Sequence, residues 1–223
     1  MEFKREEFDL AQDYQKIFVN EQTYHQLMLP YRMALGVTKA ILEGLNEEMR
    51  CTYAHSPIHY IQSRIKSPES IIEKLYRRGF AISRHGLWQL QDITGLRVIC
   101  KYVNDIYYIR ERLLLQRDIV LVRESDYIKN PKPNGYRSYH LIITVPVYNS
   151  DGKTLVPVEI QICTMGMDMW ASLEHNLRYK SEYDANDKIG KRLFLCSKML
   201  EEVDDEMQEI YQQLNDQWGT INQ

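Results

Sequence analysis

The sequence lacks the common glycine-rich and histidine-based catalytic motifs. Its 223 residues contain no Walker A loop, no GxGxxG, no HExxH and no GxSxG. Glycine (10 residues) and proline (7 residues) are sparse, and no repeat or low-complexity linker interrupts the chain. Any nucleotide bound here must therefore be held by side chains, because no glycine-rich loop is present to surround its phosphates.

Cysteines and long apolar runs are also few. The four cysteines, Cys51, Cys100, Cys163 and Cys196, form no CxxC pair, which favours reduced thiols over disulfides or a zinc site. No apolar stretch approaches the roughly 18 residues of a membrane span. The charged first seven residues are not typical of a signal peptide. These absences predict a cytoplasmic protein without a membrane partner.

Neither sign of charge is in large excess. The chain has 28 Lys and Arg against 31 Asp and Glu, a net charge of -3. This balance argues against an extended DNA-binding surface, and it gives no support for an RNA partner. The charges are nevertheless segregated, since residues 60–112 carry 10 basic and 5 acidic groups and residues 199–223 carry none and 7. A basic middle in a nearly neutral chain indicates a local anionic ligand.

Hydrophobic periodicity predicts an α+β (α/β) fold with a mixed sheet of about four to five strands and flanking helices. Predicted strands cover residues 93–102, 119–123, 139–148 and 155–162, and Asp151-Gly152 predicts a hairpin between the last two. Predicted helices cover the first fifty residues, 105–116, and a segment from Ser67 to about Gly79. Ser56 before Pro57 predicts one more helix start.

Two further helices are predicted near the C-terminus. In the first, Trp170 to Leu177, we expect Met169, Leu173 and Leu177 to contact the core. The second, over about 186–218, carries apolar residues alternately four and three apart, which is a heptad seam. This seam would pack on the N-terminal helix or another subunit, or be an ordinary amphipathic face. Its members are Ile189, Leu193, Cys196, Leu200, Val203, Met207, Ile210 and Leu214.

Two basic segments suit an anionic nucleotide. Arg64 and Lys66 precede a predicted helix, Ser70 lies in its first turn, and Lys74 follows one turn later. Cations and a hydroxyl at a helix N-terminus form an anion site, although a solvated basic face is the alternative. Arg97 is embedded in an apolar strand, where it needs either a carboxylate partner or a ligand such as a purine base.

Two carboxylates suit a divalent cation. Glu159 and Gln161 alternate with apolar residues and share one face of a predicted strand, and Asp92 lies at the entrance of another strand. On neighbouring strands, Asp92 and Glu159 would bind one Mg²⁺, which takes one or two carboxylates together with phosphate oxygens. A salt bridge between Glu159 and Arg97 is the rival interpretation.

The segment 130–140 predicts a shaped loop, with two prolines and Asn134-Gly135 before Tyr136. An aromatic ring flanked by cations would stack on a second base, although a plain turn is the alternative.

Together these segments resemble the small alarmone synthetases, the single-domain RelA/SpoT-type (p)ppGpp synthetases, or GTP pyrophosphokinases, of the RelP and RelQ kind. The matching strings are RIKSPESIIEKL, DITGLRVIC, DYIKNPKPNGYRSYH, VEIQI and MDMWASLEHNLRYK, with HSPIH and GMDMWASLEH closer to RelP. The resemblance implies one synthetase domain over 1–223 with a nucleotidyltransferase-like core at about 55–180. It also implies helical extensions at 1–50 and 186–218.

The resemblance implies transfer of pyrophosphate from ATP to the 3′-hydroxyl of GTP or GDP, with Mg²⁺ as cofactor, by a homotetramer that serves the stringent response. No histidine is followed by aspartate, so we expect no HD-type hydrolase activity. Cys163 stands where the family has the arginine of EIQIRT. That departure keeps open an alternative function, a catalytically weak nucleotide- or RNA-binding regulator on the same fold. A third function, addition of nucleotides to RNA, ranks last because it needs two carboxylates close together on one strand, and the sequence has no such pair.

Residue roles follow from the same resemblance. Glu159 and Asp92 are the catalytic pair and the metal ligands, and Glu159 would also activate the 3′-hydroxyl. The residues implied for ATP are Arg64 and Arg97 around the adenine, with Lys66, Ser70 and Lys74 on the phosphates. Those implied for GTP or GDP are Tyr136, which stacks on guanine, and Lys132, Asn134, Arg137, His140, Gln161, Asp168 and Glu174.

Overall fold

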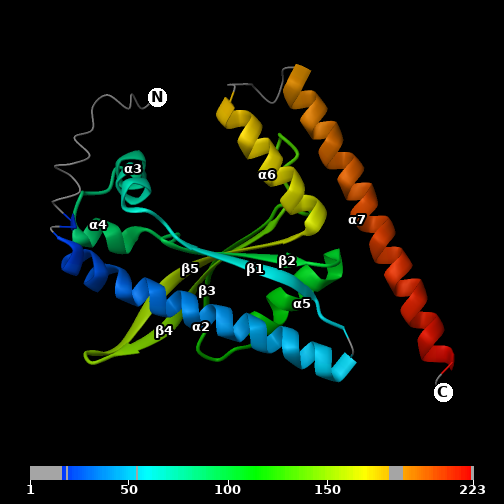
Figure 1. Cartoon of the computed structure of the whole chain (residues 1–223), viewed down its shortest axis with the longest axis horizontal. Helices are drawn as coiled ribbons and strands as arrows, with labels where there is room; N and C mark the ends of the chain where they lie inside the picture. The colour runs from blue at the N-terminus through cyan, green and yellow to red at the C-terminus, as the bar shows by residue number, and fades with distance from the viewer. Residues whose placement is uncertain (1–16, 19, 54, 181–187, 222–223) are drawn as a thin grey trace.

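A five-stranded mixed sheet forms the centre of the computed structural model (Figure 1), which describes residues 17–18, 20–53, 55–180 and 188–221. The strand order is β1-β2-β5-β4-β3; β2 and β5 are parallel, and the other neighbours are antiparallel. The strands are β1 (Ile58–Ile65), β2 (Thr94–Cys100), β3 (Val120–Asp126), β4 (Tyr139–Asn149) and β5 (Gly152–Thr164).

The four predicted strands are confirmed as β2, β3, β4 and β5, and their β-branched residues fill the sheet. The predicted hairpin is also confirmed, because Gly152 begins β5 with φ of 112°, in the region that favours glycine. The predicted α+β class with four to five strands therefore describes the fold correctly.

The fifth strand, β1, corrects the sequence analysis. Ser56 and Pro57 predicted a helix start, but the chain enters an edge strand that pairs with β2 from Ile58 opposite Cys100 to Ile65 opposite Thr94. The prediction was wrong because pairing with a buried apolar strand outweighs a short local capping signal. Proline is tolerated there, since it precedes the first residue of an edge strand.

Six helices flank the sheet in the described part of the chain. They are α2 (Glu21–Tyr53), α3 (Pro68–Arg78), α4 (Arg84–Gln89), α5 (Val103–Leu114), α6 (Met165–Lys180) and α7 (Lys188–Ile221). The predicted start and stop of α3 are confirmed: Ser67 accepts a hydrogen bond from Ser70 N, and Gly79 ends the helix with φ of 68°. The N-terminal helical prediction holds from residue 21, and residues 1–16 and 19 lie outside the described residues.

One face of the sheet is apolar and covered. Helix α2 packs on β1, β2, β4 and β5, and α5 packs on β2 and β5. Tyr31, Leu42, Val98, Ile143 and Ile160 are among the fully buried residues between these layers. In Figure 1, α3 and α4 lie toward one end of the sheet, and α6 and α7 toward the other. None of the described helices is long and apolar enough to cross a membrane.

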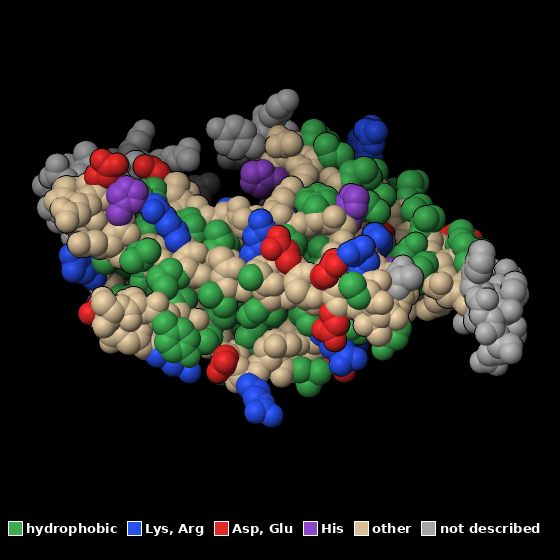
Figure 2. Space-filling model, turned by 60° about the horizontal axis from the view of Figure 1, so that its bottom comes forward, with side chains coloured by type: hydrophobic (Ala, Val, Ile, Leu, Met, Phe, Trp, Pro, Cys, Tyr) green, Lys and Arg blue, Asp and Glu red, His purple; other side chains and the backbone are tan. Residues whose placement is uncertain are grey.

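The two C-terminal helices differ from expectation in which side chains they bury. Met169, Leu173 and Leu177 of α6 are 46–54% exposed, so the predicted core contacts were wrong. Helix α7 packs on α6 and α5, while most of its seam, including Val203 and Met207, faces away from the chain. Figure 2 shows hydrophobic side chains gathered on the side of the molecule formed by α6 and α7.

Candidate active site

Polar side chains cross the uncovered face of the sheet in two rows, which the strand register defines. Strand alternation places every second residue on this face, opposite the apolar side packed on α2. One row contains Gln62, Arg97, Gln161, His140 and Ser125, and the next contains Arg64, Gly95, Glu159, Ile142 and Arg123. Residues from all five strands therefore meet on one surface.

A cavity of about 450 Å³ opens at the β1 side of this surface. Arg64, Arg97, Glu159 and Gln161 line it, and Gly95 contributes only backbone to the wall between the two arginines. Its volume is within the range of small-molecule sites. The structure thus brings both arginines predicted for the adenine to one cavity that also reaches Glu159.

Asp92 contacts both lysines that are predicted to bind the ATP phosphates. Its Oδ2 accepts a hydrogen bond from Lys66 Nζ at 2.6 Å and another from Lys74 Nζ. Burial alone would raise the pKa of Asp92, but the two ammonium groups outweigh burial and lower it. Ser70 is exposed in the first turn of α3, close in sequence to both lysines. Both lysines therefore share one carboxylate oxygen, and the three groups together keep one positive charge.

The other oxygen of Asp92 bears on the expected metal. Asp92 Oδ1 is buried and has no hydrogen-bond partner among the residues that the structure describes, which is costly unless a ligand completes it. Asp92 and Glu159 both line a second cavity of about 280 Å³. Among the described residues, no cluster of three or more His, Cys, Asp or Glu is placed to hold a metal ion. Two carboxylates facing one cavity, one with a free oxygen, fit Mg²⁺, which takes its remaining ligands from phosphates and water.

Glu159 lies where three cavities meet. It lines the arginine cavity, the cavity with Asp92, and a third of about 270 Å³ that Tyr127 and His140 also line. Arg97 does not pair with it, since its Nη1 donates to Asp168 at 2.8 Å and its Nη2 to Gln161 at 3.4 Å. The rival interpretation, a Glu159–Arg97 salt bridge, is therefore wrong.

Tyr136 and His140 form a neutral pair on the part of the surface that is predicted to bind GTP or GDP. Burial raises the pKa of Tyr136 to about 12 and, with nearby cations, lowers the pKa of His140 to about 4. Tyr136 Oη and the neutral imidazole of His140 therefore share a hydrogen bond at Nε2, 2.8 Å long, whose direction is set by the imidazole tautomer. Lys132 Nζ lies 4.9 Å from the centre of the Tyr136 ring and 4.7 Å from that of Tyr127. The structure thus brings Lys132 and Tyr136 together at the predicted loop, with Tyr127 as an additional ring.

His140 gives a pH-dependence that can be measured. The unfolded chain binds a proton on this imidazole below pH 6.5, whereas the folded chain does so only near pH 4. The free energy of unfolding should therefore fall as the pH drops from 6.5 to 4, with at most about 3 kcal/mol from this group. In His140→Gln, urea denaturation between pH 7 and 5 should show a shallower loss than in the exposed control His175→Gln. Parallel losses in the two variants would contradict this assignment.

Residues 130–140, called the acceptor loop because the resemblance implies GTP or GDP binding there, contact α6 and α7. Arg137 is buried and faces Asp204 at 3.6 Å and Glu201 at 3.9 Å, both on α7. The resemblance implies GTP or GDP binding for Arg137, but the structure buries its side chain against α7, which favours a role in fixing the shape of the loop. Asn134 Nδ2 lies 3.5 Å from Glu174 Oε1 on α6, so these two predicted acceptor residues do meet.

Gly135 is the closest contact of this loop with α7. It has φ of 94°, its carbonyl accepts a hydrogen bond from Ser197, and a Cβ would lie 2.9 Å from Ser197 Cβ. Gly135→Ala should lower the free energy of unfolding by about 1–3 kcal/mol from the backbone alone and more from the clash. Gly152→Ala is the matched control, because Gly152 also has positive φ but open space around it. Urea denaturation should give a larger loss for Gly135→Ala, and equal losses would argue against the clash.

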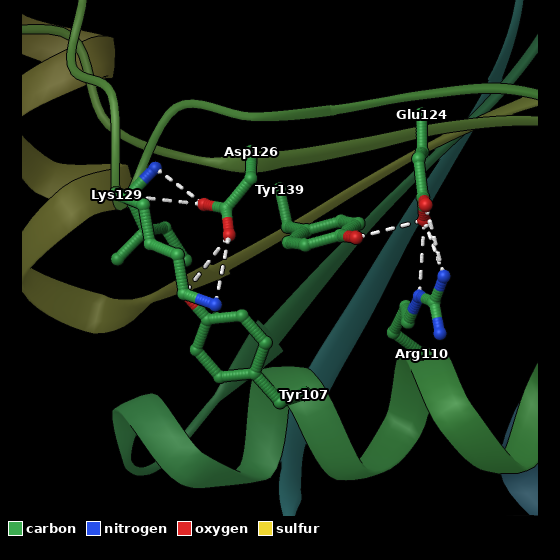
Figure 3. A network of polar contacts seen from close by, with 7 residues as sticks. Tyr107, Arg110, Glu124, Asp126, Lys129 and Tyr139 are labelled. Atoms are coloured by element: carbon green, nitrogen blue, oxygen red, sulfur yellow. Dashed lines mark hydrogen bonds and ion pairs between the residues drawn. The ribbon is translucent and has the colours of Figure 1, made fainter.

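Side chains of α5 form hydrogen bonds with β3, the strand that precedes this loop (Figure 3). Arg110 donates to Glu124 at 3.0 and 2.7 Å, and Tyr139 Oη donates to the same carboxylate at 2.7 Å. Tyr107 Oη donates to Asp126 Oδ2 at 3.2 Å, while Asp126 Oδ1 accepts two backbone N–H groups of the following turn. These contacts fix the end of β3 from which the acceptor loop departs.

Several residues at the site escaped the sequence analysis. Arg78, at the end of α3, and Arg123, on β3, line the two cavities beyond Glu159. Strand alternation was the signal that could have identified Arg123. Tyr60, whose Oη donates to Asp168 at 2.9 Å, was missed because a helix, not a strand, was predicted to start at Ser56 and Pro57. Cys163 is buried, and its pKa is raised to about 12 by burial, so it presents a neutral thiol where the family has an arginine.

The order of these elements can be compared with known proteins. A family model described as the region found in RelA / SpoT proteins matches residues 63–184, which contain the arginine, aspartate, loop and glutamate segments above. The chain belongs to the RelA/SpoT family. It is 37% identical over 192 residues to the GTP pyrophosphokinase YjbM of Bacillus subtilis, covering 86% of this chain and 90% of that protein. To YwaC of the same organism it is 38% identical over 181 residues, covering 81% and 86%.

Solved structures agree with this RelA/SpoT assignment. The small alarmone synthetase 1 of Bacillus subtilis, solved with its product pppGpp, matches with a TM-score of 0.77 and 37% identity, covering 86% of this chain and 98% of that one. A GTP pyrophosphokinase family protein of Streptococcus pneumoniae matches with a TM-score of 0.77 and 38% identity, covering 86% and 95%. The predicted synthetase fold is therefore confirmed.

Proposed function

We propose that this chain transfers the pyrophosphate group of ATP to the 3′-hydroxyl of GTP or GDP, giving pppGpp or ppGpp and AMP. The observation that carries the proposal is the position of Glu159 at the junction of an arginine-lined cavity and a tyrosine- and histidine-lined cavity. Two nucleotides placed in these cavities would meet at a carboxylate. The close relatives are GTP pyrophosphokinases, and one was solved with pppGpp.

The donor site is formed by cations. Arg64 and Arg97 would hold the adenine between their guanidinium planes, which stack well on aromatic rings. Lys66, Lys74 and the hydroxyl of Ser70 would bind the phosphates, after the lysines exchange Asp92 for phosphate oxygens.

The acceptor site faces it across Glu159. Tyr136 would stack on the guanine, with Lys132, Asn134 and His140 around the loop and Gln161 beside Glu159. Glu174 would act through Asn134, which it contacts. Hydrogen bonding and stacking of this kind would hold the 3′-hydroxyl near the donor phosphates.

The reaction moves one pyrophosphate group. Glu159 would accept the proton of the 3′-hydroxyl as that oxygen bonds to the β-phosphorus, while the bond from the β-phosphorus to the oxygen of the α-phosphate breaks and AMP departs with the electron pair. Asp92 and Glu159 would hold Mg²⁺, which supplies charge neutralisation on the phosphates when bound. Positioning by the two sets of side chains provides most of the remaining catalysis.

The proposal is tested by incubating the purified chain with ATP, Mg²⁺ and labelled GDP or GTP, followed by chromatographic separation. We expect a labelled product with two additional phosphates and an equal amount of AMP. Absence of transfer under every nucleotide condition would instead favour the catalytically weak regulator.

We further propose a homotetramer in the cytoplasm, with the outward seam of α7 at a subunit interface. Val203 and Met207 are 57% and 49% exposed, although they are apolar and lie on one face of α7. Val203→Asp with Met207→Asp should lower the mass measured by light scattering without lowering the melting temperature of the subunit. The matched control Glu202→Asp with Glu206→Asp changes two exposed acids of the same helix. Equal masses for the two double variants would exclude this seam from the interface.

A further inference from the structure

Arg97 is held in place by a residue that the sequence analysis assigned to the other nucleotide. Asp168, in the first turn of α6, was expected on the guanine side. Its Oδ1 instead accepts from Arg97 Nη1 at 2.8 Å, and its Oδ2 accepts from Tyr60 Oη at 2.9 Å. Both oxygens of this carboxylate are thus engaged on the β1 and β2 side of the sheet.

The burial of these groups indicates a built arrangement. The Asp168 side chain is 13% exposed, whereas that of Arg97 is 32% exposed and lines the 450 Å³ cavity. Burial and the hydrogen bond to Asp168 raise the pKa of Tyr60, so its hydroxyl remains a donor. The carboxylate is therefore mostly buried and hydrogen-bonded to Tyr60, which is itself 38% exposed, while the guanidinium that it binds remains open to a ligand.

The geometry constrains the plane of the guanidinium. Arg97 donates through Nη1 to Asp168 on α6 and through Nη2 to Gln161 on β5, at 2.8 and 3.4 Å. A planar group tied at two nitrogens to two different elements loses the freedom to rotate about its long side chain. Ligand binding then costs less conformational entropy than it would with a free arginine.

We propose that Asp168, supported by Tyr60, is a positioning residue for Arg97 in the ATP site and has no direct role in binding the guanine nucleotide. The inference rests on the proposed function, specifically on Arg97 contacting the adenine of ATP. Under this proposal, the first turn of α6 contributes to specificity for ATP. The same helix also contacts the acceptor loop, through Glu174.

The test is steady-state kinetics of Asp168→Asn and Tyr60→Phe in the full chain, with ATP and GDP varied separately. Asp168→Asn removes the charge but keeps the shape, so we expect KM for ATP to rise about tenfold, with kcat and KM for GDP changing less than twofold. The Kd of a non-hydrolysable ATP analogue should rise by the same factor. Tyr60→Phe should raise KM for ATP about threefold. Asp118→Asn and Tyr148→Phe are exposed controls of the same chemistry.

Three results would overturn the proposal. A rise in KM for GDP alone would return Asp168 to the acceptor site. Unchanged KM and Kd values in Asp168→Asn would show that Arg97 binds ATP without support from Asp168. Equal rises in KM for ATP and for GDP, with a lower melting temperature, would show that the Arg97–Asp168 ion pair only holds α6 against the sheet.

Arg97→Lys, measured in parallel, separates this proposal from the proposed function. If Arg97→Lys raises KM for ATP and Asp168→Asn does not, only the positioning role fails. If Arg97→Lys leaves KM for ATP unchanged, the assignment of Arg97 to ATP fails and the positioning role fails with it. The double variant Arg97→Lys with Asp168→Asn should be no worse than Arg97→Lys alone, because the two residues act as one unit. Additive losses would contradict the inference.

Discussion

Glu159→Gln should lower the rate of pyrophosphate transfer by about a thousandfold, the scale of losing a positioned general base. Glutamine keeps the size and hydrogen-bonding shape of the side chain but cannot accept the proton of the 3′-hydroxyl. It also removes one of two charges that face the cavity with Asp92. Because Glu159 is only half buried and is not paired with Arg97, the fold should be unaffected.

The measurement is AMP formation from ATP and GDP at saturating Mg²⁺, alongside the melting temperature of the variant. Glu111→Gln, on the exposed surface of α5, is the matched control and should keep full activity. Activity of Glu159→Gln within tenfold of the unaltered chain would remove Glu159 from the role of base. A large drop in melting temperature would instead attribute the loss to folding, contrary to expectation.

Asp92→Asn should have two opposite effects on nucleotide handling. Mg²⁺-dependent transfer should fall at least a hundredfold, since Asp92 is one of the two carboxylates proposed to hold the ion. Binding of a non-hydrolysable ATP analogue without Mg²⁺ should become tighter, because a negative charge is removed and Lys66 and Lys74 are released from their shared partner.

Titration of the analogue with and without Mg²⁺ separates these effects. The unaltered chain should bind more tightly when Mg²⁺ is added, and Asp92→Asn should lose most of that difference. Asp118→Asn, a carboxylate exposed to solvent, should behave as the unaltered chain does. Weaker binding of Asp92→Asn in the absence of Mg²⁺ would show that Asp92 orients the lysines for phosphate instead of competing for them.

The sequence predicted the parts of the site that depend on local pattern. Alternation along β5 placed Glu159 and Gln161 on one face, and the cap at Ser67 placed Ser70 in the first turn of α3 with Lys74 one turn later, both as the structure has them. Resemblance to a known family then related these segments to one another. Strand order supplied the physical reason, since β2 and β5 are neighbours and bring Gly95 beside Glu159.

The errors concern contacts between distant segments. The local signal at Ser56 and Pro57 gave no information about β2, whose pairing converts the segment into β1. The resemblance implied the guanine nucleotide for Asp168, whereas the structure pairs it with Tyr60 and Arg97, 108 and 71 residues away. Helical periodicity does not specify which neighbour a side chain reaches. Apolar spacing on α6 likewise indicates a buried face without specifying whether the chain itself buries it.

Helix α7 has one side in contact with the acceptor loop and one side that is open. On one side Ser197 and Asp204 hold Gly135 and Arg137, while Val203 and Met207 on another side are open to solvent. A helix is about 10 Å across. Any polypeptide that covers the open side therefore lies one helix diameter from the backbone of the loop that carries Tyr136, and a tilt of α7 would be transmitted directly to that loop.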